Sequence, residues 1–126
     1  MRDFALRFIE AMLALDLSAL ASMLADEVVW HLPPFAKRPP LRGCAAVLTF
    51  VQEAQAAYYQ AGTLSLEPTM VVADSDSAAV LGTLRGRTIR GNDYENCYSF
   101  VFRITGGRVV EAWELLDTAH LLAQMR

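Results

Sequence analysis

The hydrophobic pattern changes its period near Gly62, and this change limits the folds open to the chain. Before Gly62, apolar residues recur at helical spacings, as at Phe4, Phe8 and Met12. After Gly62, the pattern has period two and clusters of turn-forming residues interrupt it. Helices followed by hairpin-linked strands predict an α+β domain with an antiparallel sheet. The 126 residues form a single domain of ordinary size, residues 1–126.

The predicted elements follow from these patterns. Helices are expected over Arg2–Leu15, Asp16–Ala25 and Cys44–Ala61, with a short C-terminal helix over Thr118–Met125. Strands are expected over Val28–Leu32, Leu64–Ala73, Ala78–Arg90, Tyr94–Ile104 and Arg108–Leu116. The prolines of the loop Pro33–Pro40 disfavour regular structure and make it stiff. A curved antiparallel sheet packed on three N-terminal helices gives a cone whose open mouth can hold a small ligand.

Composition excludes several classes of protein. Hydrophobic residues make up 54% and charged residues 20%, which is unlike a disordered chain. A net charge of −3 without a Lys/Arg cluster argues against a nucleic-acid partner. The two cysteines, Cys44 and Cys97, suggest neither a disulfide framework nor a metal site. No signal peptide or membrane-spanning run is recognised, so we expect a cytoplasmic protein. The high apolar fraction predicts a buried interface or an internal cavity.

Alternation along the strands predicts which side chains face this cavity. Asn96, Tyr98 and Phe100 share one face of their strand. Glu111, Trp113, Leu115 and Asp117 share a face of the last strand, if no bulge intervenes. The predicted pocket comprises Phe8, Met12, Trp30, Leu32, Phe50, Tyr58, Phe100, Glu111, Trp113 and Leu115. Strict alternation points His31 away from the cavity.

An aromatic pocket with few polar groups suits proton transfer next to a carbonyl. That chemistry needs a base and a hydrogen-bond donor placed where the enolate oxygen develops charge. Tyr98 and Asn96 are candidate donors, or they form buried structural hydrogen bonds. Glu111 would need a partner if it is buried, and Arg85 or Arg87 could supply it.

The chain order and two segments resemble the nuclear transport factor 2-like superfamily, in its SnoaL-like and ketosteroid-isomerase-like branch. "LDLSALASMLADEVVWHL" (Leu15–Leu32) is similar to the branch's helix-helix-strand entry, and "SFVFRITGGRVVEAWELLDT" (Ser99–Thr118) to its last hairpin. The resemblance implies a homodimer through the sheet. It also makes Asp117 the candidate base, because the final-strand region supplies acid/base carboxylates in SnoaL-like enzymes. Alternatively, Asp117 only caps the last helix, with His120 near it.

Two catalytic patterns of the resembled branch are incomplete here. The steroid isomerases carry a carboxylate before a proline on the first strand, where this chain has Leu32 before Pro33. The epoxide hydrolases carry an Arg and an Asp two residues apart on a strand that reads Ala79–Leu84 here. Three interpretations stay open: a cofactor-independent isomerase, cyclase or lyase acting on a small cyclic carbonyl compound, a domain that only binds a small apolar molecule, and a dimerisation module.

Overall fold

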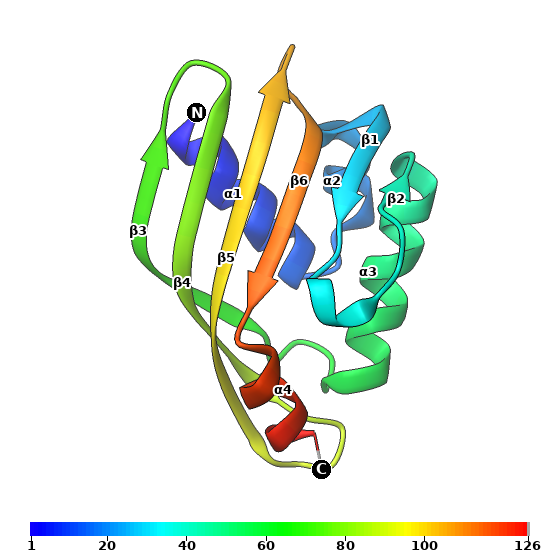
Figure 1. Ribbon diagram of the computed structural model, residues 1–126, viewed down its shortest axis with the longest axis vertical. Helices are drawn as coiled ribbons and strands as arrows, with labels where there is room; N and C mark the ends of the chain where they lie inside the picture. Colours follow the sequence, from blue (N-terminus) through cyan, green and yellow to red (C-terminus); the bar gives the residue numbers. More distant parts are fainter. Residues whose placement is uncertain (126) are drawn as a thin grey trace.

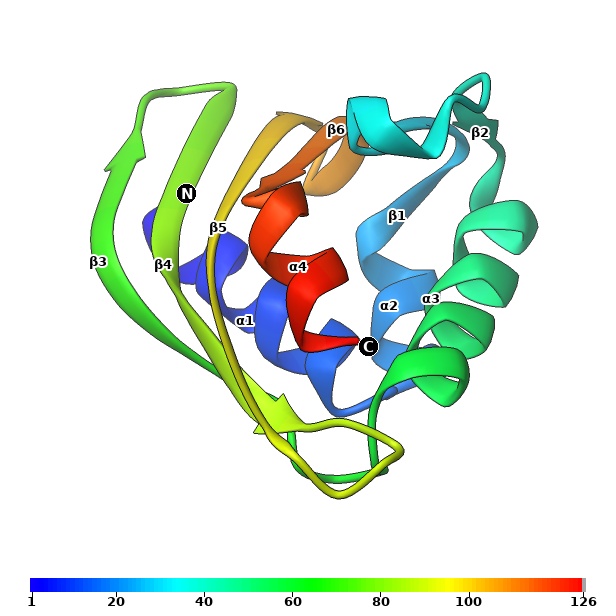
Figure 2. The same cartoon turned by 60° about the horizontal axis from the view of Figure 1, so that its bottom comes forward.

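A computed structural model describes residues 1–125, apart from the side chain of Phe35, and shows one curved sheet with helices on its inner side (Figures 1 and 2). The helices are α1 (Arg2–Leu13), α2 (Leu17–Met23), α3 (Cys44–Tyr58) and α4 (Thr118–Gln124), with a single 3-10 turn over Pro34–Ala36. The strands are β1 (Leu24–His31), β2 (Leu41–Arg42), β3 (Ser65–Ala73), β4 (Ser77–Arg87), β5 (Asp93–Thr105) and β6 (Arg108–Leu116). The predicted α+β fold class is confirmed.

The strands follow the order β2-β1-β6-β5-β4-β3 across the sheet. All neighbouring pairs are antiparallel except β1 and β6, which are parallel, so the sheet is mixed. The parallel pair arises because α3 carries the chain from the β1–β2 edge to β3 at the opposite edge (Figure 1). The last strand then returns beside the first one and completes the wall of the cone.

Several element boundaries differ from the predicted ones, and the short strand β2 was not predicted. The second helix ends at Met23, and β1 begins at Leu24, four residues before the predicted Val28. The helix α3 ends at Tyr58, because Tyr59 has an extended backbone with φ −128° and forms a bridge to Thr88. This early end directs the Tyr59 side chain toward the sheet.

The backbones of β3 and β4 approach each other closely at Gly82. A Cβ atom at this position would lie 2.6 Å from the backbone oxygen of Glu67 on the neighbouring strand. The pairing of β3 with β4 shifts by one residue between Pro68 and Met70, next to this contact. Glycine lets the two strands approach closely at this register shift, because it has no Cβ atom.

The narrow end of the cone is filled by an aromatic cluster. Phe8 of α1 packs edge-on against Phe102 of β5, with ring centroids 5.1 Å apart, and lies 6.1 Å from Trp30 of β1. All three side chains are fully buried. Phe8 and Trp30 were predicted as pocket residues. They lie instead in this core, because α1 packs directly on the sheet there and leaves no space for a ligand.

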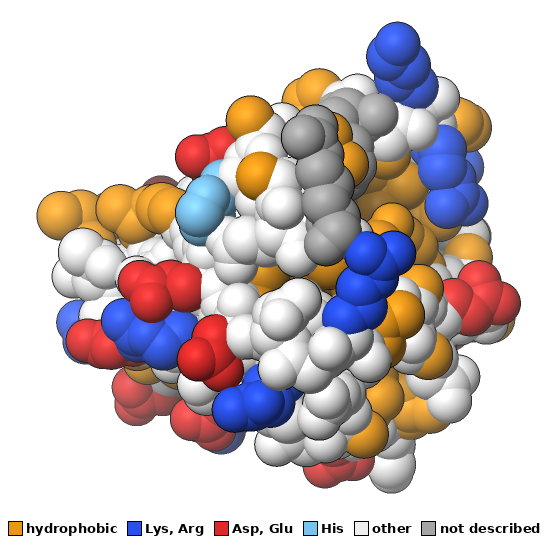
Figure 3. All heavy atoms as spheres, turned by 90° about the horizontal axis from the view of Figure 1, so that it is seen from below, with side chains coloured by type: hydrophobic (Ala, Val, Ile, Leu, Met, Phe, Trp, Pro, Cys, Tyr) orange, Lys and Arg blue, Asp and Glu red, His pale blue; other side chains and the backbone are white. Residues whose placement is uncertain are grey.

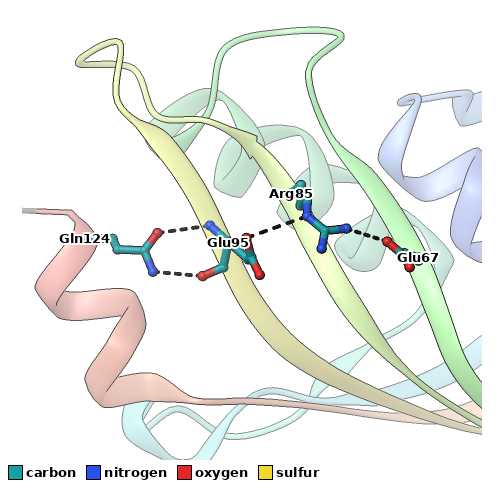
Figure 4. Close-up of polar contacts among 4 residues, drawn as sticks. All are labelled: Glu67, Arg85, Glu95 and Gln124. Carbon is teal, nitrogen blue, oxygen red and sulfur yellow. Dashed lines mark hydrogen bonds and ion pairs between the residues drawn. The ribbon is translucent and has the colours of Figure 1, made fainter.

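The Gln124 side chain fixes the C-terminal helix α4 against the β4–β5 hairpin, because it hydrogen-bonds to the backbone of β5 as a neighbouring strand would (Figure 4). The Gln124 amide accepts a hydrogen bond from the Glu95 backbone N–H at 3.0 Å and donates one to the Glu95 carbonyl at 2.8 Å. Arg85 joins Glu95 to Glu67 through ion pairs of 3.6 and 2.7 Å. These contacts hold α4 in the mouth of the cone, between the sheet and α3 (Figure 2).

The outer face of the sheet carries exposed apolar side chains, among them Leu81 and Leu115. A homodimer through this face stays a prediction. In residues 1–125, no helix is both long and apolar enough to cross a membrane.

Candidate functional site

A cavity of about 300 Å³ lies at the wide end of the cone, between α3, the inner face of β5 and β6, and α4. Its volume is at the small end of the range for small-molecule pockets. Its wall is mostly apolar, and it includes six of the predicted site residues: Met12, Leu32, Phe50, Tyr58, Tyr98 and Phe100. Seen from below, apolar side chains are exposed on the right of the molecule with basic ones among them, whereas most acidic ones lie on the left (Figure 3).

A bulge in β6 reverses the predicted facing of its side chains. Ile104 pairs with Val109 but Arg103 pairs with Glu111, so Val110 is an extra residue in the hairpin. Beyond this bulge the alternation changes phase. The structure therefore places Glu111, Trp113 and Leu115 on the outer face, opposite to the one predicted. The inner positions belong to Ala112, Glu114 and Leu116, and the last two line the cavity.

Glu111 has partners on the outer face of the sheet. Its carboxylate lies 2.7 Å from His31 Nε2 and 3.5 Å from the Arg103 guanidinium. The His31 ring stacks on Trp113 with centroids 5.0 Å apart, and Arg103 lies over the same indole. His31 points away from the cavity, as expected. The ion-pair partners of Glu111 are thus His31 and Arg103 rather than Arg85 or Arg87.

Glu114 is the carboxyl group of the cavity wall. It pairs with Phe100 across the β5–β6 ladder and keeps some accessible surface, because it faces the cavity. Burial among apolar side chains raises the pKa of the Glu114 carboxyl from 4.5 to about 7. The indole N–H of Trp30 favours the ionised form and offsets part of this rise. A carboxyl group with a pKa near 7 can both accept and give up a proton at neutral pH.

A hydrogen-bond chain leads from Asn96 to the cavity through Tyr94. The Asn96 Oδ1 accepts from the backbone N–H of Cys97 at 2.8 Å, which orients the amide group. Its Nδ2 group then donates to the Asp117 carbonyl at 2.9 Å and to the Tyr94 hydroxyl at 3.0 Å. Either Tyr94 or Tyr98 can donate across the 3.1 Å between their hydroxyls, but among the described residues only donation to Tyr98 gives the buried Tyr94 proton an acceptor.

The end of this chain leaves one phenolic proton free at the cavity wall. The hydroxyls of Tyr59 and Tyr98 are 3.3 Å apart, and either one can donate to the other. In both cases, the second of the two protons has no acceptor among the described residues. Both tyrosines line the cavity, and burial raises the pKa of each phenol above its usual value, so both stay protonated. The cavity therefore presents a hydrogen-bond donor to a ligand.

The other predicted polar residues lie outside the cavity wall. Asp117 is an exposed N-cap, and its carboxylate accepts from the His120 backbone N–H at 3.0 Å. Asn96 is buried behind Tyr94 and reaches the cavity only through the tyrosines. Of the predicted donors, Tyr98 alone lies on the wall.

The wall also contains one basic side chain, which the sequence did not single out. Arg38 lies in the loop between β1 and β2, is exposed, and borders the cavity. Within residues 1–125, no carboxylate forms an ion pair with its guanidinium. In the same part of the chain, no group of three His, Cys, Asp or Glu side chains is arranged to hold a metal ion.

Comparisons with known proteins agree with this fold. An NTF2-like protein of unknown function from Burkholderia pseudomallei superposes with a TM-score of 0.83 at 23% identity, over 98% of this chain and 95% of that one. IdmH from Streptomyces antibioticus, a candidate polyketide cyclase, gives 0.80 at 26% identity, over 97% and 95%. A SnoaL-like polyketide cyclase from Agrobacterium tumefaciens gives 0.76 at 14% identity, over 98% and 96%.

A search among curated proteins finds no match for this chain. The family model of the SnoaL-like domain matches residues 5–112, which cover most of α1, all of α2 and α3, and most of the sheet. The matched segment ends just before Glu114. The chain therefore belongs to the SnoaL-like domain family.

Proposed function

We propose that this protein is a cofactor-independent enzyme that moves a proton next to the carbonyl group of a small, largely apolar cyclic compound. One observation carries the proposal: a carboxyl group with a pKa of about 7 and a free phenolic proton line the same apolar cavity. These are the base and the donor that enolate chemistry requires. The similarity to IdmH supports cyclisation as the overall reaction.

The proposed reaction uses Glu114 and Tyr98 in succession. The Glu114 carboxylate removes a proton from the carbon next to the carbonyl, and the electron pair of that C–H bond forms the enolate. The Tyr98 hydroxyl donates a hydrogen bond to the enolate oxygen, where negative charge develops. Glu114 then returns its proton to a carbon of the product. The hydrogen bonds from Tyr94 and Asn96 polarise Tyr98 and make it a stronger donor.

The mouth of the cavity suggests a second feature of the ligand. Arg38 borders the cavity and lacks a carboxylate partner among the described residues. A guanidinium there binds a carboxylate well, because it can donate two parallel hydrogen bonds. We therefore expect a ligand whose apolar rings fill the cavity and whose acidic substituent, where present, lies near Arg38.

The proposal is tested by hydrogen exchange, which needs no knowledge of the natural substrate. The protein is incubated with 2-tetralone in D₂O, and NMR follows deuterium entering the carbons next to the carbonyl. We expect exchange well above the buffer rate, abolished by Glu114→Gln and reduced by about tenfold to a hundredfold by Tyr98→Phe. Glu111→Gln is the matched control, because Glu111 lies on the same strand but on the outer face.

Binding is measured beside exchange, with 2-naphthol as a mimic of the enolate. Saturable binding without exchange would favour the interpretation that the domain binds a small molecule without converting it. If no exchange occurs and neither 2-naphthol nor its carboxylate analogue 6-hydroxy-2-naphthoate binds, the result would oppose a ligand site of this kind. Arg38→Ala should weaken the binding of the carboxylate analogue only. Arg42→Ala, at an exposed position of β2, should weaken the binding of neither compound.

A further inference from the structure

Trp30 contains a buried donor that the core does not need. Its side chain is fully buried against Phe8 and Phe102. Among the buried side-chain nitrogen and oxygen atoms of the described residues, Trp30 Nε1 is the one that has no hydrogen-bond partner. A buried N–H without an acceptor is unfavourable, so its presence calls for a compensating interaction.

The sheet places the indole next to Glu114. Trp30 pairs with Ala112 in the parallel β1–β6 ladder, and Glu114 is the next inward residue of β6. Such diagonal neighbours on one face of a sheet are within reach of long side chains. The indole also favours the ionised form of Glu114, which is the effect of an N–H directed at a carboxylate. Trp30 does not line the cavity, so it lies behind the Glu114 carboxyl as seen from a ligand.

We propose that Trp30 is a positioning residue, whose indole N–H donates to the Glu114 carboxylate whenever that group is ionised. Because an indole N–H can only donate, this hydrogen bond favours the carboxylate over the acid. It holds one carboxylate oxygen at the wall and leaves the other free to take a proton in the cavity. The proposal deepens the proposed function by naming what holds its base, but the hydrogen bond itself requires no turnover.

The other charged or titratable groups that face this cavity are Arg38, Tyr58, Tyr59 and Tyr98. The pKa of both Tyr59 and Tyr98 is raised by burial, so these phenols do not ionise near neutral pH. His31 and Glu111 lie on the opposite face of the sheet, where His31 stacks on Trp113. A pH change that ionises Glu114 should therefore affect the indole of Trp30 rather than that of Trp113.

The first test uses the unaltered protein. Its two tryptophans give two indole N–H signals in a ¹⁵N–¹H spectrum, and Trp113→Phe assigns them. We expect the Trp30 signal to move with a midpoint near pH 7, as Glu114 ionises. Glu114→Gln should abolish this movement and leave any titration of the Trp113 signal in place. A Trp30 signal that stays constant from pH 5 to 9, while the Glu114 carboxyl itself titrates, would overturn the proposal.

The second test removes the donor. Trp30→Phe keeps an aromatic ring in the core, and the ¹³C signal of the Glu114 carboxyl then reports its pKa directly. We expect the pKa of Glu114 to rise by about one unit, and to stay unchanged in Trp113→Phe. If 2-tetralone exchange is observed, its pH midpoint should shift with this pKa. An unchanged pKa in folded Trp30→Phe would contradict the positioning role, whereas absent exchange with a shifted pKa would oppose only the proposed function.

Discussion

The hydroxyls of Tyr94 and Tyr98 lie 3.1 Å apart, and the Asn96 amide donates to the first of them. Either hydroxyl can donate to the other, but among the described residues the buried Tyr94 proton has an acceptor only when Tyr94 donates to Tyr98. This direction matters because it determines where the last proton of the hydrogen-bond chain is directed. That proton belongs to Tyr98 or Tyr59, and both line the cavity. Three buried residues thus combine to present one donor to a ligand.

Tyr94→Phe is expected to weaken ligand binding although Tyr94 does not touch the cavity. The change removes the bond that polarises Tyr98 and leaves a buried Asn96 N–H without an acceptor. We expect affinity for 2-naphthol to fall several-fold and stability to fall by about 1–3 kcal/mol. Calorimetric titration and chemical unfolding measure the two effects. Tyr58 lines the same cavity but is not part of the hydrogen-bond chain, so Tyr58→Phe should bind 2-naphthol as the unaltered protein does. Unchanged affinity of Tyr94→Phe for 2-naphthol would contradict the proposed role of the hydrogen-bond chain.

Glu114 should make the protein less stable as pH rises. The folded-state pKa of Glu114 is raised from 4.5 to about 7, so between these values the folded protein binds more protons than the unfolded one. The stabilising contribution of the protonated group is complete below pH 4.5 and is lost as pH rises through 7. The loss amounts to at most about 3 kcal/mol.

Glu114→Gln removes this titration, so comparing the two proteins cancels the other ionisable groups. Urea unfolding at pH 5 and at pH 8 should show the Gln variant gaining stability relative to the unaltered protein at the higher pH. Parallel pH dependences in the two proteins would mean that the pKa of Glu114 is not raised by folding.

Variants of Asp117 distinguish its structural role as a helix N-cap from a chemical role as the base. Its carboxylate accepts from the His120 N–H at the start of α4. We expect Asp117→Ala to lower the free energy of unfolding by about 1 kcal/mol, and Asp117→Asn to be nearly neutral, because Asn is also a good N-cap. Neither change should slow 2-tetralone exchange. If Asp117→Asn abolished exchange in a stable protein, Asp117 would be the base and the assignment of Glu114 would be wrong.

Two glycines of β4 should differ sharply in their tolerance of alanine. A Cβ at Gly82 would lie 2.6 Å from the backbone oxygen of Glu67, whereas one at Gly86 would lie 2.6 Å from the Leu64 Cδ2 atom. The side chain of Leu64 can move away, but the strand backbone at Glu67 cannot do so without altering the sheet. We expect Gly82→Ala to cost about 2 kcal/mol or more and Gly86→Ala about 1 kcal/mol or less. Equal melting temperatures of the two variants would contradict the requirement for glycine at Gly82.

The fold was largely predictable, because each half of the chain has its own hydrophobic period. The phase of the side-chain alternation in β6 was not predictable, since Val109 and Val110 are both β-branched and the sequence does not mark the bulge at Val110. Because of this one extra residue, Glu114 lies at the cavity wall in place of the predicted Glu111. The position of Trp30 in the core depends on how closely α1 packs on the sheet. Alternation within one strand gives no information about that distance.

The most direct measurement is the pH dependence of 2-tetralone exchange in the unaltered protein and in Glu114→Gln. We expect the exchange rate to rise with a midpoint near pH 7, as the Glu114 carboxyl ionises, and to stay at the buffer rate in the variant. An equal rate in the two proteins at every pH would show that Glu114 is not the base. It would contradict the central claim that the carboxyl buried in this cavity performs the proton transfer.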